Sequence, residues 1–275
     1  MQTSISATSA LVLNWTDPAL WQTPLAAEYM RGLDLGEGRS LLEQFSKEEN
    51  FMHTQTVSCR KFFMKKTVCA FLERLHRENR SGQVVILAAG LAPLSAEIAS
   101  LFPSSAVFDV DIHNMHEKRK LLGSRASNIS FCECDITDIE KLDAALAGAG
   151  FRKGEPAIAV LEGIIYYLAP AALRNILAYF SGIQAAVVGE FGLKPESVNE
   201  ATRPHLLSAF KKIQGTVNLE SVTFYSDESI AALLRDSGYE SATLHNFQPI
   251  QKERTGEEFP FVSPDSSWIK AFSAT

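Results

Sequence analysis

The chain has 275 residues, with 26 lysines and arginines against 32 aspartates and glutamates, which gives a formal charge of −6. The hydrophobic fraction of 46% and the charged fraction of 21% exclude a disordered or collagen-like chain. The acidic balance argues against a general nucleic-acid binder, which needs a basic surface. No apolar run approaches the roughly 20 residues of a membrane span, and nothing resembles a secretory signal. We therefore expect a cytoplasmic protein without nucleic-acid or membrane partners.

The first part of the chain favours helices. Apolar residues recur at helical spacing from about residue 54 to residue 79; they are Phe62, Phe63, Val68, Phe71, Leu72 and Leu75. Arg80, Ser81 and Gly82 then interrupt the pattern. The sequence predicts an N-terminal helical cap over residues 1–82.

Strands and helices alternate after this break. The expected strands are Gln83–Ala88, Ala106–Asp111, Ile129–Cys134, Ala157–Leu161 and Gln184–Phe191. The expected helices between them are Leu94–Leu101, Met115–Leu122, Ile139–Ala147 and Pro170–Phe180. Nearly continuous apolar strands that alternate with helices predict an α/β fold, whose parallel sheet is covered on both faces.

The alternation lapses between residues 192 and 221, where Pro204–Ile213 favours a helix, and then resumes. A helix is expected at Asp227–Ser237, followed by strands at Ser241–Phe247 and Ser267–Phe272. We expect a core over residues 83–275, with 192–221 as an insertion on the substrate side. Ligands of open α/β sheets bind outside the carboxyl ends of the strands, so the cap and the insertion are expected to form walls of a site.

The loop after the first strand holds one glycine, Gly90, where a dinucleotide fingerprint needs three, and it has no lysine of a P-loop. Both a nicotinamide enzyme and a nucleoside-triphosphate enzyme are therefore disfavoured. Asp109 and Asp111 follow about twenty residues later, at the end of the second strand. A carboxylate there can accept hydrogen bonds from ribose hydroxyls. Alternatively, one of the two only caps the following turn.

Four segments resemble motifs of the leucine carboxyl methyltransferase family, in the family's order and spacing. They are VVILAAGLAPL (84–94), VFDVDIHNMHEKRKLL (107–122), CDITD (134–138) and LEGIIYYL (161–168). The segment YSDESIAALLRDSGY (225–239) resembles the family's late helix and turn. The resemblance, which spans about residues 55–245, implies a Rossmann-like seven-stranded sheet with an antiparallel final hairpin. It also implies methyl transfer from S-adenosyl-L-methionine.

The resemblance also implies roles for single residues. Gly90 would let the backbone approach the methionyl part of the cofactor, and Asp111 would hold the ribose. Asp135 and Ile136 match the pair that frames the adenine. The remaining residues belong to the methionyl end: Glu162 and Tyr167 would face it, and Arg60 would pair with its carboxylate, as a fork-shaped guanidinium can.

Alternatives remain open at several positions. Arg60 could be a surface arginine, with Lys61, Lys65 and Lys66 on the exposed side of its helix. The glycine two residues before Gly90 in the family is Ala88 here. Two further sets of side chains also have two interpretations. A metal site is less typical than turn and sheet packing for the set His113, His116, Cys132 and Cys134. A substrate site is less typical than a solvated helix face for the set Arg203, His205, Lys211 and Lys212.

Two functions follow. The first is an S-adenosylmethionine-dependent methyltransferase that methylates a carboxylate or hydroxyl oxygen on a small molecule or a protein terminus. A carboxylate acceptor would need no general base, whereas a hydroxyl would need one within hydrogen-bond reach. The second is a non-catalytic binding protein that retains the methyltransferase fold, with the altered glycine loop as its sign.

Overall fold

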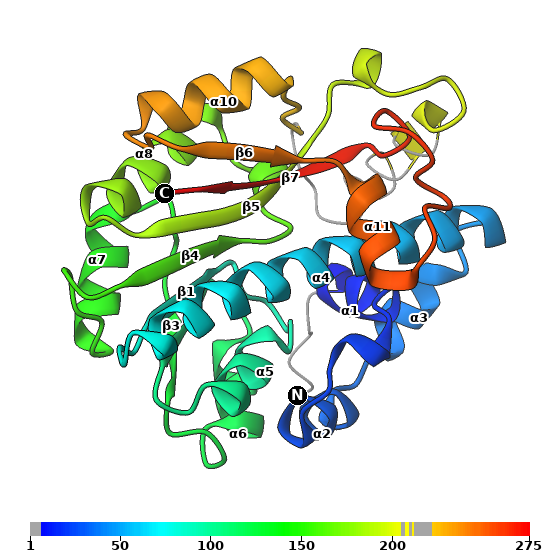
Figure 1. Ribbon diagram of the computed structural model, residues 1–275. Coiled ribbons are helices and arrows are strands. Elements are labelled where there is room, and N and C mark those ends of the chain that lie inside the picture. The colour runs from blue at the N-terminus through cyan, green and yellow to red at the C-terminus, as the bar shows by residue number, and fades with distance from the viewer. Residues whose placement is uncertain (1–6, 205–206, 209–210, 212–221) are drawn as a thin grey trace.

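The computed structural model describes residues 7–204, 207–208, 211 and 222–275 (Figure 1). At its centre lies a seven-stranded sheet with the order β3-β2-β1-β4-β5-β7-β6. The strands are β1 (Gln83–Leu87), β2 (Ala106–Asp111), β3 (Ile129–Glu133), β4 (Ala157–Leu161), β5 (Ala186–Gly192), β6 (Ala242–His245) and β7 (Ile269–Ala274). β1 to β5 pair in parallel, while β7 runs antiparallel to both β5 and β6. This topology confirms the predicted Rossmann-like sheet with its antiparallel final hairpin.

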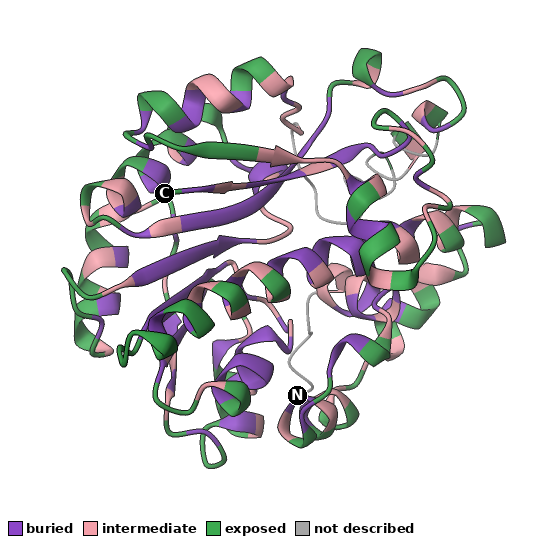
Figure 2. Ribbon diagram, viewed as in Figure 1, coloured by how far each residue is buried: buried purple, intermediate pink, exposed green. Residues whose placement is uncertain are grey.

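Helices cover both faces of the sheet. One layer contains α2 (Pro24–Gly32), α4 (Lys47–Arg77), α5 (Leu94–Leu101) and α6 (Met115–Leu122), and the other contains α7 (Ile139–Gly148), α8 (Pro170–Gly182) and α10 (Asp227–Asp236). The central strands β1 and β4 are buried along their whole length, whereas the edge strand β6 is partly exposed (Figure 2). This burial explains why the central strands are continuously apolar.

The remaining helices lie around the carboxyl ends of the strands or connect the longer elements. They are α1 (Ala7–Asn14), α3 (Gly36–Leu42), α11 (Phe247–Thr255) and the short 3₁₀ turns η1 (Pro18–Leu20), η2 (Ile165–Tyr167) and η3 (Pro195–Ser197). The helix predicted over Pro204–Ile213 lies largely outside the described residues. No helix in the described part of the chain combines the length and apolar composition that a membrane span requires.

The long helix α4 begins at Lys47, several residues earlier than the apolar spacing predicted. A capping box at Ser46 sets this start, because the Ser46 hydroxyl accepts from the Glu49 backbone N–H and the Glu49 carboxylate accepts from the Ser46 N–H. α4 packs along one face of the sheet, on β4, β5 and β7. Its N-terminal half extends past the carboxyl ends of the strands and lies beside α11 (Figure 1).

The chain between β6 and β7 differs from the prediction. A helix, α11, follows β6 directly, and β7 begins at Ile269 rather than at Ser267. The segment of α11 is polar apart from two residues, so it carries little periodic signal of its own. Phe247, Ile250 and Gln251 are its buried residues, and the helix packs on α4. Tertiary contact therefore places a helix that the local pattern does not indicate.

A buried carboxylate ties the N-terminal helices to the core. Glu97 of α5 is fully buried and accepts hydrogen bonds from the backbone N–H groups of Gln22 and Thr23 and from the Thr23 hydroxyl. Lys65 of α4 donates a further bond to it at 2.5 Å. Burial would raise the pKa of Glu97, but these donors outweigh it and lower the pKa. The charged carboxylate thus joins the segment before α2 to both α4 and α5.

Candidate active site

The carboxyl ends of three parallel strands meet at one edge of the sheet. Leu87, the last residue of β1, pairs with Val110 near the end of β2 and with Leu161 at the end of β4. The segments that follow these strands therefore begin side by side. Three of the four motif segments converge at this edge, as expected for a ligand site in an open α/β sheet.

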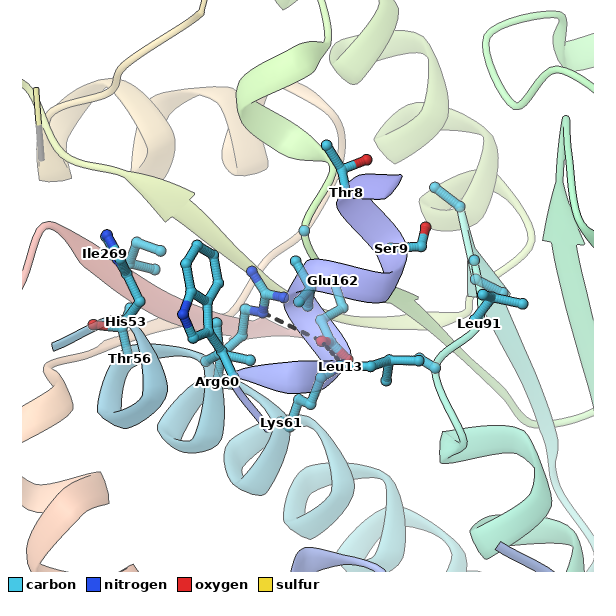
Figure 3. Close-up of a pocket in the computed structure, with 18 of the residues that line it drawn as sticks. Thr8, Ser9, Leu13, His53, Thr56, Arg60, Lys61, Leu91, Glu162 and Ile269 are labelled. Carbon is cyan, nitrogen blue, oxygen red and sulfur yellow. Dashed lines mark hydrogen bonds and ion pairs between the residues drawn. The ribbon is translucent and has the colours of Figure 1, made fainter. Parts of the chain in front are cut away.

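A cavity of about 170 Å³ lies at this edge, bordered by α1 and α4 (Figure 3). The loop after β1 contributes Gly90 to its wall, and α4 contributes Arg60 and Lys61. The segment after β4 contributes Glu162 and Tyr167. Four of the seven predicted cofactor-binding residues therefore share one cavity, although they come from three separate elements.

The loop after β1 keeps a left-handed backbone in spite of its alanine. Both Ala88 and Gly90 have a φ of +49°. A Cβ on Gly90 would lie 3.3 Å from the hydroxyl oxygen of Ser9 on α1, so the loop and α1 approach closely. Ala88 adopts at some cost a conformation that glycine adopts freely.

The two acids at the end of β2 have different surroundings. Asp111 accepts from the Gly90 N–H at 2.7 Å and from the His113 N–H at 3.0 Å, so it fixes the glycine loop and also caps its own turn. Asp109 is fully buried, 2.8 Å from the ammonium of the equally buried Lys118. Asp109 therefore belongs to an internal ion pair, and Asp111 is the acid that contacts the glycine loop.

Arg60 lies in a buried cluster of charged groups. Its Nε donates to Glu162 Oε1 at 3.2 Å, and its Nη1 donates to the Tyr166 hydroxyl at 3.1 Å (Figure 3). The Lys61 ammonium donates to the same Glu162 oxygen at 2.6 Å. Glu190 Oε1 lies 3.6 Å from Arg60 Nη1 and accepts from the Gly163 N–H at 2.5 Å. Two cations and two carboxylates thus meet in a space almost without solvent.

The pKa values of the two carboxyl groups in this cluster are shifted in opposite directions. Burial would raise the pKa of Glu162, but Lys61 and Arg60 outweigh it and hold the pKa below its usual value. Burial raises the pKa of Glu190 to about 8, because the attraction of Arg60 only partly offsets the desolvation. Burial also raises the pKa of Tyr167 to about 12, so its hydroxyl keeps its proton at neutral pH.

The interpretation of Arg60 as a surface arginine is wrong. Arg60 is 4% exposed, and the neighbouring Lys61 is buried as well. Lys65 is largely buried against Glu97, and only Lys66 is exposed, where it pairs with Glu253. The sequence alone favours an exposed basic segment, because it does not show which carboxylates contact these side chains in the folded protein.

A glycine after β4 lies beside the guanidinium. Gly163 has a φ of +73°, which favours glycine, and a Cβ at this position would be in ordinary van der Waals contact with the guanidinium atoms of Arg60, at 3.5–3.6 Å. Tyr166 is buried and Tyr167 is half-buried, and both line the cavity.

The predicted adenine residues lie apart from this cavity. Asp135 is exposed and accepts from the backbone N–H and the hydroxyl of Thr137, while Ile136 is buried. Neither of them, nor Asp111, lines the cavity. They follow β2 and β3, further along the same edge of the sheet. The structure thus separates the seven residues into four that line the cavity and three that do not. The four were predicted for the methionyl end of the cofactor and are called the methionyl group below; the three, Asp111, Asp135 and Ile136, were predicted for its nucleoside and are called the adenosine group.

The other candidates are placed differently. Arg203 donates to the carbonyl oxygens of Pro195 and Val198, and Lys211 is exposed. His205 and Lys212 lie outside the described residues. His113 and His116 are exposed near the start of α6, whereas Cys132 is buried in β3. The described residues contain no group of three or more histidine, cysteine or acidic side chains with metal-site geometry.

Sequence reasoning missed an aromatic wall of the cavity. Trp15, His53 and Trp268 line it, and each is almost fully buried. The His53 ring packs 4.6 Å from the Trp15 ring and 5.3 Å from the Trp268 ring, between centroids. His53 and Arg60 are seven residues apart, two helical turns on the same face of α4. The sequence shows that spacing, but only the fold places the two tryptophans against the His53 ring.

Known structures share this architecture. A methyltransferase candidate from Thermobifida fusca YX superposes with a TM-score of 0.61 at 15% identity, over 91% of this chain and 92% of the other. A DUF574 family protein from Streptomyces avermitilis MA-4680 gives a TM-score of 0.57 at 12% identity, over 91% and 95%. An O-methyltransferase family protein from Burkholderia thailandensis gives 0.50 at 14% identity, over 98% and 71%. At these identities the likeness establishes the fold.

A search of curated protein sequences found no match. The profile of the leucine carboxyl methyltransferase family matches residues 16–181, which include α4, the glycine loop and the segments after β2, β3 and β4. This match covers more than half of the chain and all four motif segments. The chain belongs to the leucine carboxyl methyltransferase family of S-adenosylmethionine-dependent methyltransferases.

Proposed function

We propose that this methyltransferase transfers a methyl group to an oxygen atom of a small molecule that binds at the aromatic wall of the cavity. The observation that carries the proposal is the continuity of this cavity. It runs from Gly90 and Glu162, at the strand ends, to Trp15, His53 and Trp268. A cofactor at one end and an acceptor at the other would share one cavity.

The methionyl group supports binding of the amino-acid end of the cofactor. Arg60 offers a planar guanidinium that can bind a carboxylate in two-pronged fashion, and Glu162 is a charged carboxylate that can accept from an ammonium. Gly90 gives the loop the left-handed turn that brings its backbone to the cavity. Tyr167 adds a hydroxyl that remains a donor at neutral pH. These side chains match the charges of an amino acid.

The adenosine group supports binding of the nucleoside end. Asp111 is held by two backbone N–H groups, which fix its carboxylate beside the glycine loop. Asp135 lies in the turn that follows β3, and the buried Ile136 is next to it. We assign the ribose to Asp111 and the adenine to Asp135 and Ile136.

The bound cofactor supplies a sulfonium-activated methyl group, which is transferred by in-line displacement. The protein's contribution is to hold the acceptor oxygen and the methyl group in line and to exclude water, which needs no covalent intermediate. The buried walls of the cavity support both tasks.

The charges of the cavity favour a hydroxyl acceptor over a carboxylate. Among the described residues that line it, the cations Arg60 and Lys61 belong to the cluster around Glu162 at the methionyl end, and the aromatic wall carries no lysine or arginine. An anionic acceptor there would lack a partner, which is costly in a buried site. A hydroxyl must lose its proton, and the imidazole of His53 is the candidate general base in this wall.

The experiment uses S-adenosylmethionine with a tritiated methyl group, incubated with the protein and with an extract of its host separated into small molecules and proteins. Methyl ethers withstand mild alkali, whereas methyl esters release methanol. We expect alkali-stable label in small molecules. His53→Gln should abolish most of this labelling, about 100-fold or more, with cofactor affinity unchanged.

Other outcomes identify the alternatives. Alkali-labile label would assign the acceptor as a carboxylate, and label in the protein fraction would assign it to a polypeptide. Cofactor binding without any labelled product would support a non-catalytic binding protein. Absence of cofactor binding at millimolar concentration would contradict the cofactor site itself.

A further inference from the structure

A second buried carboxylate lies behind Arg60, outside the lining of the cavity. Glu190 belongs to β5 and is fully buried. Its Oε1 accepts from the Gly163 N–H at 2.5 Å and lies 3.6 Å from Arg60 Nη1, beyond normal hydrogen-bond length. Its Oε2 has no hydrogen-bond partner among the described residues. No motif in the sequence pointed to this residue.

Glu162 and Glu190 compete for the same guanidinium. Glu162 lies nearer, at 3.2 Å from Arg60 Nε, and also holds Lys61 at 2.6 Å. Two carboxylates that share a site cannot both ionise easily, and a charged oxygen without a donor is costly to bury. Glu190 is therefore the carboxyl group that keeps its proton, and its pKa of about 8, raised by burial, agrees with this assignment.

The protonation state of Glu190 sets the net charge of the cluster to which the cofactor's carboxylate would bind. With Glu190 neutral, Arg60 and Lys61 face only the charge of Glu162, so one positive charge remains unmatched. The carboxylate of the cofactor's methionyl part carries one negative charge and would complete the balance. With Glu190 ionised, the cluster is already neutral and the same carboxylate must displace an internal partner of Arg60.

We propose that Glu190 is a positioning residue for cofactor binding: in its protonated form it leaves Arg60 with an unmatched positive charge for the cofactor's carboxylate, and in its ionised form it competes with that carboxylate. This inference rests on the proposed role of Arg60. It makes cofactor affinity fall as pH rises through the pKa of Glu190.

The groups that face Glu190 come from three elements. α4 contributes Arg60 and Lys61, the segment after β4 contributes Glu162, and η2 contributes the hydroxyls of Tyr166 and Tyr167. β7 and α8 also pack on β5, but their ionisable side chains bind elsewhere. Lys270 pairs with Asp227, Tyr179 donates to Asp143, and Arg174 is exposed. Burial raises the pKa of Glu190 most, and among the charged groups around it Arg60 and Glu162 have the largest effects.

The test is calorimetric titration of S-adenosylhomocysteine into the wild-type protein and into Glu190→Gln between pH 6.5 and 9. The ratio of the two dissociation constants cancels the ligand's own titration. We expect nearly equal affinities at pH 6.5, and a wild-type affinity that falls toward about tenfold below that of the variant at pH 9. A ratio that stays constant with pH would overturn the proposal.

5′-Methylthioadenosine is the matched control ligand, because it lacks the methionyl carboxylate. Its affinity ratio between the two proteins should not change with pH, and a change equal to that of S-adenosylhomocysteine would also overturn the proposal. If Glu190→Gln does not fold, Glu190→Leu, which is equally uncharged, replaces it with the same expectation. Failure of the wild type to bind S-adenosylhomocysteine at any pH would instead contradict the cofactor site, so the two failures are distinguishable.

Discussion

The methionyl group and the adenosine group of the candidate site are built on different principles. Arg60 and Glu162 are buried, charged and supplied by segments about a hundred residues apart, and they form an ion pair with each other. Asp111 ends β2 and Asp135 closely follows β3, and the groups that donate to their carboxylates lie within two residues or in the adjacent loop. The first group is a product of tertiary packing, and the second is a product of local turns.

The largest expected effect is a loss of folding stability when a residue of the methionyl group is replaced. Arg60→Ala removes the guanidinium that donates to Glu162 and to the Tyr166 hydroxyl, and removal of one partner from a buried ionic cluster costs about 3–5 kcal/mol. We expect this loss in the free energy of unfolding, measured by urea denaturation without cofactor. The matched control Lys66→Ala, which breaks an exposed pair on the same helix, should cost less than about 1 kcal/mol. Equal effects would contradict the buried cluster.

Substitutions in the adenosine group should lower the affinity for the cofactor rather than the stability of the fold. Asp111→Ala and Asp135→Ala each remove a carboxylate that we assign to the nucleoside, and a hydrogen bond to a charged group contributes about 1.5–3 kcal/mol. Calorimetry should show weaker binding of S-adenosylhomocysteine by about tenfold or more, with the folded state retained. The exposed Glu133, at the end of β3, is the control position. Normal binding in both aspartate variants would show that the alignment of the motifs is wrong.

Glu190, which lies beside the methionyl group, should also make the stability of the protein depend on pH. The folded pKa of Glu190 lies above its usual value of 4.5, at about 8. Its protonated form therefore contributes stability that is complete below about pH 4.5 and is lost as pH rises toward 8. Relative to Glu190→Gln, the free energy of unfolding of the wild type should fall with pH in this window, by at most about 1.4 kcal/mol per pH unit. Parallel curves for the two proteins would show that Glu190 is ionised throughout.

The smallest effect concerns the loop between the two groups. Ala88 has a φ of +49°, which glycine adopts without strain. Ala88→Gly should relieve this strain but also increase the entropy of the unfolded chain, so we expect a net stabilisation of less than about 1 kcal/mol. Thermal unfolding provides the measurement. A clear destabilisation would mean that the alanine side chain packs favourably in the loop.

The same contrast explains what the sequence could predict. The alternation of strands and helices and the acids at the strand ends are local patterns, so the sheet and the position of Asp111 followed from them. The burial of Arg60 depends on Glu162 and Glu190, which no helical pattern of α4 displays. The aromatic wall was missed for the same reason, since Trp15 and Trp268 come from opposite ends of the chain. α11 was missed because its polar sequence is helical only in contact with α4.

The central claim is that Arg60 binds the carboxylate of the cofactor, and Arg60→Lys tests it most directly because the charge of the cluster is kept. Calorimetry would compare S-adenosylmethionine with its decarboxylated form in the wild type and in this variant. We predict that the wild type prefers the carboxylated cofactor and that Arg60→Lys loses most of this preference, since a single ammonium cannot reproduce a two-pronged contact. The decarboxylated form should bind both proteins about equally. An undiminished preference in Arg60→Lys would contradict the claim and assign the carboxylate to another residue.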